Sequence, residues 1–313
     1  METPYQLLDT METRNIISQD DSGKHESDPT VVFNQFTELL SQMQAKYPEV
    51  KHLIFSSQMH ALLATDSNGE VLQKTMTWAD LRAKDIGYEM QISGQAKEFF
   101  ALSGTPIHAM NPFVKLAYLN QSRPDLFGDP SIQFMDIKAY IIRRLTGEYV
   151  IDYATASSMG LMDLANHKWS KKLLNHVNIQ KKQLAKLVSS RQKIPVKAEF
   201  IQSLQLAKGF QILPGSTDGA LANLSNLAYA SQEDQSLSPF VLSFGTSAAV
   251  RTLSDQLSIN ESGQVFSYIA DDKPHYIIGG PVNNAGNVLE WLYQHFGFME
   301  KGQSFEDMLQ VIW

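Results

Sequence analysis

The narrowest limits on the fold of this chain come from one stretch that joins an apolar run, a glycine turn, a single acid and an apolar helical pattern. It runs Leu213-Pro214-Gly215-Ser216-Thr217-Asp218-Gly219-Ala220-Leu221-Ala222-Asn223-Leu224. This order predicts a strand that turns directly into a helix, with Asp218 at the turn. A carboxylate placed there exposes its oxygens at the end of a sheet, where a substrate hydroxyl can reach them. Asp is also a favoured N-cap residue, so the alternative is that Asp218 only caps the helix.

A second stretch repeats this layout further along the chain. It runs Phe240-Val241-Leu242-Ser243-Phe244-Gly245-Thr246-Ser247. Its turn offers backbone N–H groups and two hydroxyls to an anionic group, whereas a plain hairpin turn is the alternative. A base and an anion-binding turn on neighbouring strands together indicate phosphoryl transfer to an alcohol.

Composition excludes several other classes of protein. The 313 residues suffice for two domains or one large one, and a formal net charge of −7 argues against nucleic-acid binding. The absence of cysteine excludes disulfides, thiolate nucleophiles and zinc–thiolate sites. No run of about 18 apolar residues occurs, and the first residues do not form a signal peptide. A cytoplasmic protein that does not bind membranes is therefore expected.

Local patterns in the first part of the chain predict helices and a hairpin. Asp28 and Pro29 are typical of a helix N-cap and first turn, and residues 53–55 are typical of a buried strand. Residues 61–65 and 71–72 predict a hairpin closed by Asn68-Gly69. The polar residues 11–28 are expected to form a loop. From Thr105 to about Ile212 the pattern is mostly helical, most clearly over residues 134–147.

After Gln235 the sequence pattern changes and predicts strands followed by two helices. This change, with the polar residues around 230–238, predicts a domain boundary that divides the chain into 1–235 and 236–313. Interleaved strands and helices indicate an α/β protein, with the two marked turns facing each other across a cleft. The expected strands are 239–244, 247–252, 264–270 and 275–278, and the expected helices are 284–296 and 304–312.

Five segments carry a further signal when they are taken in order. They are Ser56-Ser57-Gln58-Met59-His60-Ala61, Thr77-Trp78-Ala79-Asp80-Leu81-Arg82-Ala83, Gly215-Ser216-Thr217-Asp218-Gly219-Ala220, Gly245-Thr246-Ser247 and Gly279-Gly280-Pro281-Val282-Asn283-Asn284-Ala285-Gly286. This series resembles the motifs of the FGGY carbohydrate kinases, and its residues are most similar to those of the gluconokinases. The likeness extends from about residue 25 to the C-terminus.

The resemblance implies a fold, a reaction and a set of site residues. The implied fold has two domains of the ribonuclease-H-like, actin-like ATPase type with a substrate cleft between them. The implied reaction uses ATP and Mg²⁺ to phosphorylate a sugar hydroxyl, with a sugar acid as the small-molecule partner; a homodimer is left open. No protein ligand for the metal is assigned. By motif position, Asp218 is the general base, Gly245, Thr246 and Ser247 approach the ATP phosphates, and Met59, His60, Trp78 and Asp80 line the sugar pocket.

The chemistry of these side chains agrees with such a pocket. A polyhydroxylated substrate needs short polar groups such as His60 and Asp80, with a flat apolar wall such as Trp78 behind its carbons. The alternatives are that His60 is a satisfied buried histidine, that Trp78 only packs in the core, and that Asp80 caps a helix near Leu81. A gluconate carboxylate needs a cation nearby; Arg82 and Lys115 are candidates, although Arg82 can also form a surface ion pair.

The chain also departs from the family pattern at both ends. It has no Asp-x-Gly-Thr-Thr-like first phosphate loop, and it stops at Val311-Ile312-Trp313 before the glycine-rich adenosine-binding segment. We therefore expect a truncated chain with an incomplete second domain. Three functions stay open: conversion of D-gluconate to 6-phospho-D-gluconate, phosphorylation of another polyol or ketose such as xylulose or glycerol, and an inactive fragment that at most binds sugar.

Overall fold

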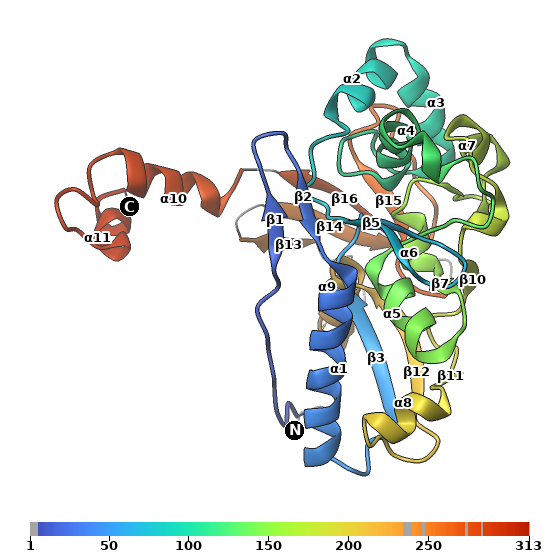
Figure 1. Ribbon diagram of the computed structural model, residues 1–313. Helices are drawn as coiled ribbons and strands as arrows, with labels where there is room; N and C mark the ends of the chain where they lie inside the picture. The colour runs from blue at the N-terminus through green and yellow to red at the C-terminus, as the bar shows by residue number, and fades with distance from the viewer. Residues whose placement is uncertain (1–5, 234–239, 246–247, 273–274, 283, 313) are drawn as a thin grey trace.

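The computed structural model describes residues 6–233, 240–245, 248–272, 275–282 and 284–312. Its elements form an α/β arrangement in which sheets are flanked by helices (Figure 1). The longer helices are α1 (Pro29–Lys46), α2 (Lys84–Ile92), α3 (Gln95–Ser103), α4 (Pro112–Ser122), α5 (Ile137–Thr146), α9 (Asp218–Glu233), α10 (Gly286–His295) and α11 (Phe305–Ile312). The shorter ones are α6 (Tyr153–Ser157), α7 (Lys171–His176), α8 (Ala198–Ser203), η1 (Pro124–Leu126) and η2 (Lys181–Gln183).

A five-stranded sheet lies beside α1 and contains the expected hairpin. The Asn68-Gly69 turn joins its β4 and β5 strands, with Gly69 at a φ of 93°. The neighbouring segment 11–28, expected as a loop, contributes two short strands to this sheet, so that expectation was wrong. The strand order is β1 (Ile17–Gln19), β2 (His25–Ser27), β5 (Val71–Met76), β4 (Leu62–Thr65) and β6 (Gln133–Met135).

The ends of these helices lie where the sequence predicts them, except for the start of α5. Asp28 accepts a hydrogen bond from the Thr30 N–H at 3.0 Å, and Pro29 occupies the first turn of α1. Helix α5 is capped by Asp136 and ends at Gly147, which adopts the left-handed conformation. The helix starts at Ile137 and not at residue 134, because residues 133–135 pair with β4 as an edge strand.

The segment from Thr105 to Ile212 is less helical than expected. Several strands of two or three residues interrupt it, and such short pieces leave almost no periodic signal. The pair β7–β10 is parallel, whereas β8–β9 is antiparallel, as is the pair of β11 with β12 (Gln211–Thr217). These strands are β7 (Val150–Asp152), β8 (Met162–Asp163), β9 (Lys168–Trp169), β10 (Lys186–Val188) and β11 (Ile194–Pro195).

Two long strands, β3 (His52–Ser57) and β12 (Gln211–Thr217), run parallel and in contact. Their register places Thr217 opposite Ser57, so the two strands end at the same edge of the sheet. The register shifts between Leu213 and Ser216, at the point where Gly215 adopts a φ of 64°. Helix α9 begins directly after β12, as the strand–turn–helix pattern predicts.

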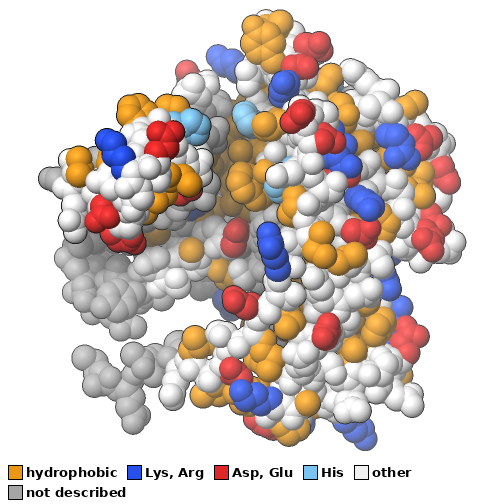
Figure 2. All heavy atoms as spheres, turned by 60° about the vertical axis from the view of Figure 1, so that its left-hand side comes forward, with side chains coloured by type: hydrophobic (Ala, Val, Ile, Leu, Met, Phe, Trp, Pro, Cys, Tyr) orange, Lys and Arg blue, Asp and Glu red, His pale blue; other side chains and the backbone are white. Residues whose placement is uncertain are grey.

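A separate antiparallel sheet forms the C-terminal part. Its strand order is β13 (Val241–Phe244), β14 (Ala248–Ser254), β16 (Tyr276–Val282) and β15 (Phe266–Ile269), close to the expected ranges. Helix α9 packs on β14, whereas α10 and α11 extend away from the sheet (Figure 1). Figure 2 shows a recess between these projecting helices and the body of the molecule, with hydrophobic side chains along its wall. Exposed apolar side chains on this sheet and just before it are Phe240, Leu242, Phe244, Val250 and Val282.

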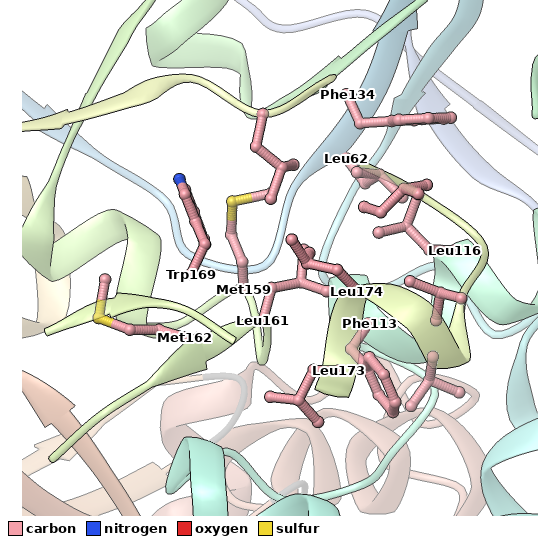
Figure 3. Packing of buried hydrophobic residues seen from close by; sticks show 14 of the residues in the cluster. Leu62, Phe113, Leu116, Phe134, Met159, Leu161, Met162, Trp169, Leu173 and Leu174 are labelled. Atoms are coloured by element: carbon pink, nitrogen blue, oxygen red, sulfur yellow. The ribbon is translucent and has the colours of Figure 1, made fainter. Parts of the chain in front are cut away.

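Three buried clusters hold these layers together. The largest lies among the helices that follow the five-stranded sheet; Figure 3 shows Phe113, Leu116, Leu173 and Leu174 packing against one another. A second cluster fills the space between α1, α5 and the β3–β12 pair. The third is small and joins α9 to the C-terminal sheet through Ala220, Phe266, Tyr268, Ala270 and Ile277.

Candidate active site

Asp218 follows the carboxyl end of β12 and is the first residue of α9. Its side chain is exposed to solvent. Its Oδ1 accepts a hydrogen bond from the adjacent Gly219 N–H at 2.7 Å. The longer-range capping bond of the helix is made by Thr217, whose Oγ1 accepts from the Ala220 N–H at 3.3 Å. Because Thr217 supplies this cap, Asp218 is left at the sheet edge with a carboxylate that solvent and ligands can reach.

The segment beneath Asp218 is held by buried polar contacts. Lys138 Nζ lies 2.6 Å from Asp152 Oδ2 and donates to the Ser216 carbonyl at 3.3 Å. Both charged side chains are almost fully buried, so their pairing is needed to offset desolvation. Ser216 Oγ also donates to the Ala270 carbonyl at 2.9 Å. These bonds fix the end of β12 to α5, to α6 and to the loop after β15.

Met59 and His60 follow β3 and therefore lie at the same sheet edge as Asp218. The Met59 methyl lies only 3.0 Å from the place that a Cβ on Gly219 would take. His60 has a φ of 65°, and its Nδ1 lies 2.9 Å from the Ser158 carbonyl, which identifies Nδ1 as the donor. Burial lowers the pKa of His60 to about 3, so the imidazole is neutral. Its ring packs edge-on against Tyr268, with the ring centroids 5.8 Å apart.

Lys115 joins the two segments that carry the predicted sugar-pocket residues. Its ammonium donates to the His60 carbonyl at 2.7 Å and to the Thr77 carbonyl at 2.6 Å. The residue before Trp78 is thereby fixed beside the loop that carries Met59. Burial lowers the pKa of Lys115 to about 7. With its donors used and its side chain fully buried, Lys115 does not reach a substrate carboxylate.

Trp78 and Asp80 occupy the turn after β5 in different environments. Trp78 is 48% exposed and presents a flat apolar surface. The Asp80 carboxylate is fully buried, accepts from the His25 N–H at 3.0 Å and pairs with Arg82 Nη2 at 2.7 Å. Arg82 also pairs with Glu26 at 2.6 Å, so it is a partly buried member of a network and not a surface ion pair. Asp80 and Arg82 brace the turn that carries Trp78, and a direct sugar contact of Asp80 stays a prediction.

Gly245 directly follows β13 and is exposed, while Thr246 and Ser247 lie outside the described residues. The Gly245 carbonyl accepts a hydrogen bond from the N–H of Gly286, the first residue of α10. The predicted phosphate-binding turn is therefore connected to the start of α10.

Three further side chains at this place were not singled out from the sequence. Tyr268 lies against His60, His108 is close enough for its charge to lower the pKa of His60, and Arg251 approaches Gly219. Of these three residues, only Arg251 could have been noticed in the sequence, because it is a basic residue on a strand whose neighbours are mainly apolar or small. Tyr268 and His108 have no motif that marks them.

Within the described residues, no group of three or more His, Asp or Glu side chains converges as a metal cluster. A nucleotide-bound Mg²⁺ does not require such a cluster, because it is held largely by phosphate oxygens and water. Across the same part of the chain, no helix combines the length and apolar character needed to cross a bilayer.

Comparison with protein families identifies much of the chain. The N-terminal domain model of the FGGY family of carbohydrate kinases matches residues 4–225. A gluconokinase from Bacillus subtilis (strain 168) is 32% identical over 283 residues, which cover 90% of this chain and 54% of that protein. The chain thus spans about half the length of the curated relatives it matches.

Solved structures show the same similarity. A ligand-bound xylulose kinase and a gluconate kinase, both from Lactobacillus acidophilus, superpose with TM-scores of 0.87 and 0.86. Each is 32% identical in sequence, and each match covers 96% of this chain and 59% of the other. These similarities confirm the expected α/β, actin-like ATPase fold.

Proposed function

Because this chain belongs to the FGGY family of carbohydrate kinases, we propose that it supplies the sugar site and general base of a D-gluconate kinase that forms 6-phospho-D-gluconate. The single observation that supports this most is the position of Asp218. Its exposed carboxylate lies at the carboxyl edge of the parallel β3–β12 pair, next to the loop that carries Met59. Ligands of α/β sheets bind at such edges.

In the proposed reaction, a substrate hydroxyl oxygen attacks the terminal phosphorus of ATP. A new O–P bond forms, the bond to the bridging oxygen breaks, and ADP leaves with the bonding electrons. The hydroxyl proton passes to the Asp218 side chain, which is accessible enough to accept it. Mg²⁺ bound with the nucleotide would neutralise developing phosphate charge. The protein mainly positions the reactants, which fits a site fixed by buried bonds behind β12.

The proposed sugar pocket is formed by Met59, His60, Trp78 and Asp80. Neutral His60 can bond to hydroxyls through Nε2, and the open face of Trp78 can cover the carbon chain. Asp80 acts here through the buried network that fixes the Trp78 turn. Lys115 holds the two segments together from behind.

We also propose that the chain divides into 1–235, which carries the sugar site, and 236–313, which approaches the nucleotide. The boundary falls within residues 234–239, which lie outside the described residues. The separate C-terminal sheet supports this division, and Gly245 with Thr246 and Ser247 would face the ATP phosphates. Successive N–H groups in such a turn suit an anion.

A second candidate substrate is a ketose. Similarity to the xylulose kinase from Lactobacillus acidophilus is as high as similarity to the gluconate kinase, at 32% identity for each. Sugar binding without turnover is the third candidate.

The proposed base is tested by ADP release from this chain with ATP, Mg²⁺ and D-gluconate. Asp218→Asn is expected to lower turnover by about 10²- to 10⁴-fold, because the hydroxyl loses its proton acceptor. Gluconate binding, measured by calorimetry, should change little. Asp125→Asn, at an exposed ion pair with Arg123, is the matched control and should leave turnover unchanged. Intact turnover in Asp218→Asn would remove the base assignment.

The acceptor is tested with a panel of D-gluconate, D-xylulose and glycerol. Turnover of gluconate in preference to the neutral substrates supports the proposal. Turnover of the ketose without gluconate would replace it with the second candidate. Calorimetric binding of gluconate without binding of ATP would favour a chain that binds sugar but does not phosphorylate it.

A further inference from the structure

Arg251 projects from β14 onto the face of the C-terminal sheet that packs against α9. Its guanidinium lies beside the start of that helix, with Nε 3.6 Å and Cζ 3.8 Å from the place of a Cβ on Gly219. On the other side, a Cβ on Gly279 would lie 3.0 Å from Arg251 Cγ. Two glycines thus leave the space that this long side chain occupies next to Asp218.

The charge of Arg251 is poorly compensated where it lies. Its Nε is buried and has no hydrogen-bond partner within the described part of the chain, and Nη1 donates to the neutral Ser243 hydroxyl at 2.7 Å. No carboxylate of the described residues lies within ion-pair distance of the guanidinium. Burial lowers the pKa of Arg251, whereas the more distant charge of Asp218 raises it. A cation beside a helix N-terminus is also electrostatically unfavourable.

Other cations of the molecule are arranged differently. A second basic hollow is lined by Lys74, Arg82 and Arg123 among others, and each of these three has a carboxylate partner at 2.9 Å or less. Lys138 is paired with Asp152. Arg251 differs because it is partly desolvated without such a partner, while its bond to Ser243 lies at the surface. The guanidinium tip can therefore be reached from solvent.

We propose that Arg251 binds an oxyanion beside Asp218 and thereby determines which substrates the site accepts. The proposal rests on the proposed function and deepens it, because two oxyanions would meet there: the carboxylate of a sugar acid and the terminal phosphate of the nucleotide. Planar guanidinium groups suit both, through paired N–H donors. Its guanidinium borders the space beside the Gly219 α-carbon that the Met59 methyl also borders, which favours the sugar as the source. Its bond to Ser243, two residues before Gly245, also connects it to the predicted phosphate turn.

The two sources are distinguished by binding measurements on the full chain. The probes are sodium D-gluconate, its neutral analogue D-glucitol, MgATP and MgADP, each titrated by calorimetry into the wild type and Arg251→Gln. If the carboxylate is the ligand, gluconate binding weakens by about 10- to 100-fold while glucitol binding is unchanged. If the terminal phosphate is the ligand, MgATP binding weakens while MgADP binding does not. Arg251→Lys, which keeps the charge but not the paired donors, should give an intermediate loss.

Arg123→Gln is the matched control, because it removes an arginine charge from the exposed ion pair with Asp125 at the start of η1. Equal weakening of gluconate and glucitol, or no weakening of any probe, would overturn the proposal. If Arg251→Gln does not fold, Arg251→Lys and the wild-type preference for gluconate over glucitol decide the question. If the wild type binds no sugar and Arg251→Gln weakens the binding of MgATP, the proposed function is contradicted. The same result would support the binding of an oxyanion by Arg251.

Discussion

His60 combines a left-handed backbone with a buried, neutral imidazole, and its burial makes folding depend on pH. Because burial lowers the pKa of His60 to about 3, the unfolded chain binds a proton in acid that the folded chain does not. Stability from this group is therefore present above the ordinary histidine pKa and is lost as pH falls towards 3. The loss amounts to about 2 kcal/mol between pH 7 and pH 5.

His60→Asn tests this coupling, because Asn tolerates a positive φ and does not titrate. Urea unfolding at pH 7 and pH 5 should show a smaller loss of unfolding free energy in the variant than in the wild type. His52→Asn, on an exposed position of β3, is the control and should keep the wild-type dependence. Equal pH dependence in His60→Asn would contradict the lowered pKa.

At the level of single residues, the sequence predicted part of the arrangement of the candidate site. Asp218 and Met59 follow strands that run parallel, so their proximity could be anticipated once the strands were recognised. The environment of Asp80 could not, because His25, which donates to it, and Glu26, which shares its partner Arg82, come from a strand that meets the Asp80 turn only in the folded sheet. Arg251 was overlooked for the same reason: its missing countercharge is a property of the packed structure.

Among the elements, the β3–β12 pair depends on one glycine. At Gly215 the backbone has a φ of 64°, and a Cβ would lie 1.9 Å from the Phe55 carbonyl oxygen. Gly215→Ala therefore combines left-handed strain with a backbone clash, and we expect a loss of several kcal/mol. Gly209→Ala is the matched control, because Gly209 also has a positive φ but no atom within 4 Å of its Cβ position.

Thermal unfolding followed by circular dichroism measures both variants. Gly209→Ala should cost about 1–3 kcal/mol, the strain alone, while Gly215→Ala should unfold at a clearly lower temperature or fail to fold. Similar unfolding temperatures would show that β12 can move away from β3 at little cost.

Helices and strands were predicted correctly where a residue with its own backbone preference marks the end of the element. Pro29, the Asn68-Gly69 turn and Gly147 each act through their own backbone preference, and the structure has the expected element at each. The prediction failed over residues 11–28 and in much of 105–212, where strands of two or three residues are held by their partners and not by their own pattern.

On the scale of the whole molecule, the C-terminal sheet presents one apolar face to solvent. Leu242 is 64% exposed and lies opposite Val250 in the register of β13 and β14. Contiguous exposed apolar surface of this kind binds hydrophobic dyes and reduces solubility. Leu242→Ser should therefore lower the fluorescence of bound anilinonaphthalene sulfonate. Ile92→Ser, at a 67% exposed position on α2, is the control and should change it less. Equal effects would mean that the sheet face is not the dye-binding surface.

The bare α-carbon of Gly219 has a consequence for which acceptors fit. A methyl group there would press first on the end of the Met59 thioether, a mobile chain, and only at longer range on the Arg251 guanidinium. The Met59 side of Gly219 is therefore deformable, whereas β12 is held to β3 by backbone pairing. In the proposed sugar site, side-chain size at Gly219 and Met59 would therefore set the length of carbon chain that can be accommodated, and changes there would alter selectivity while sparing the carboxylate at Asp218.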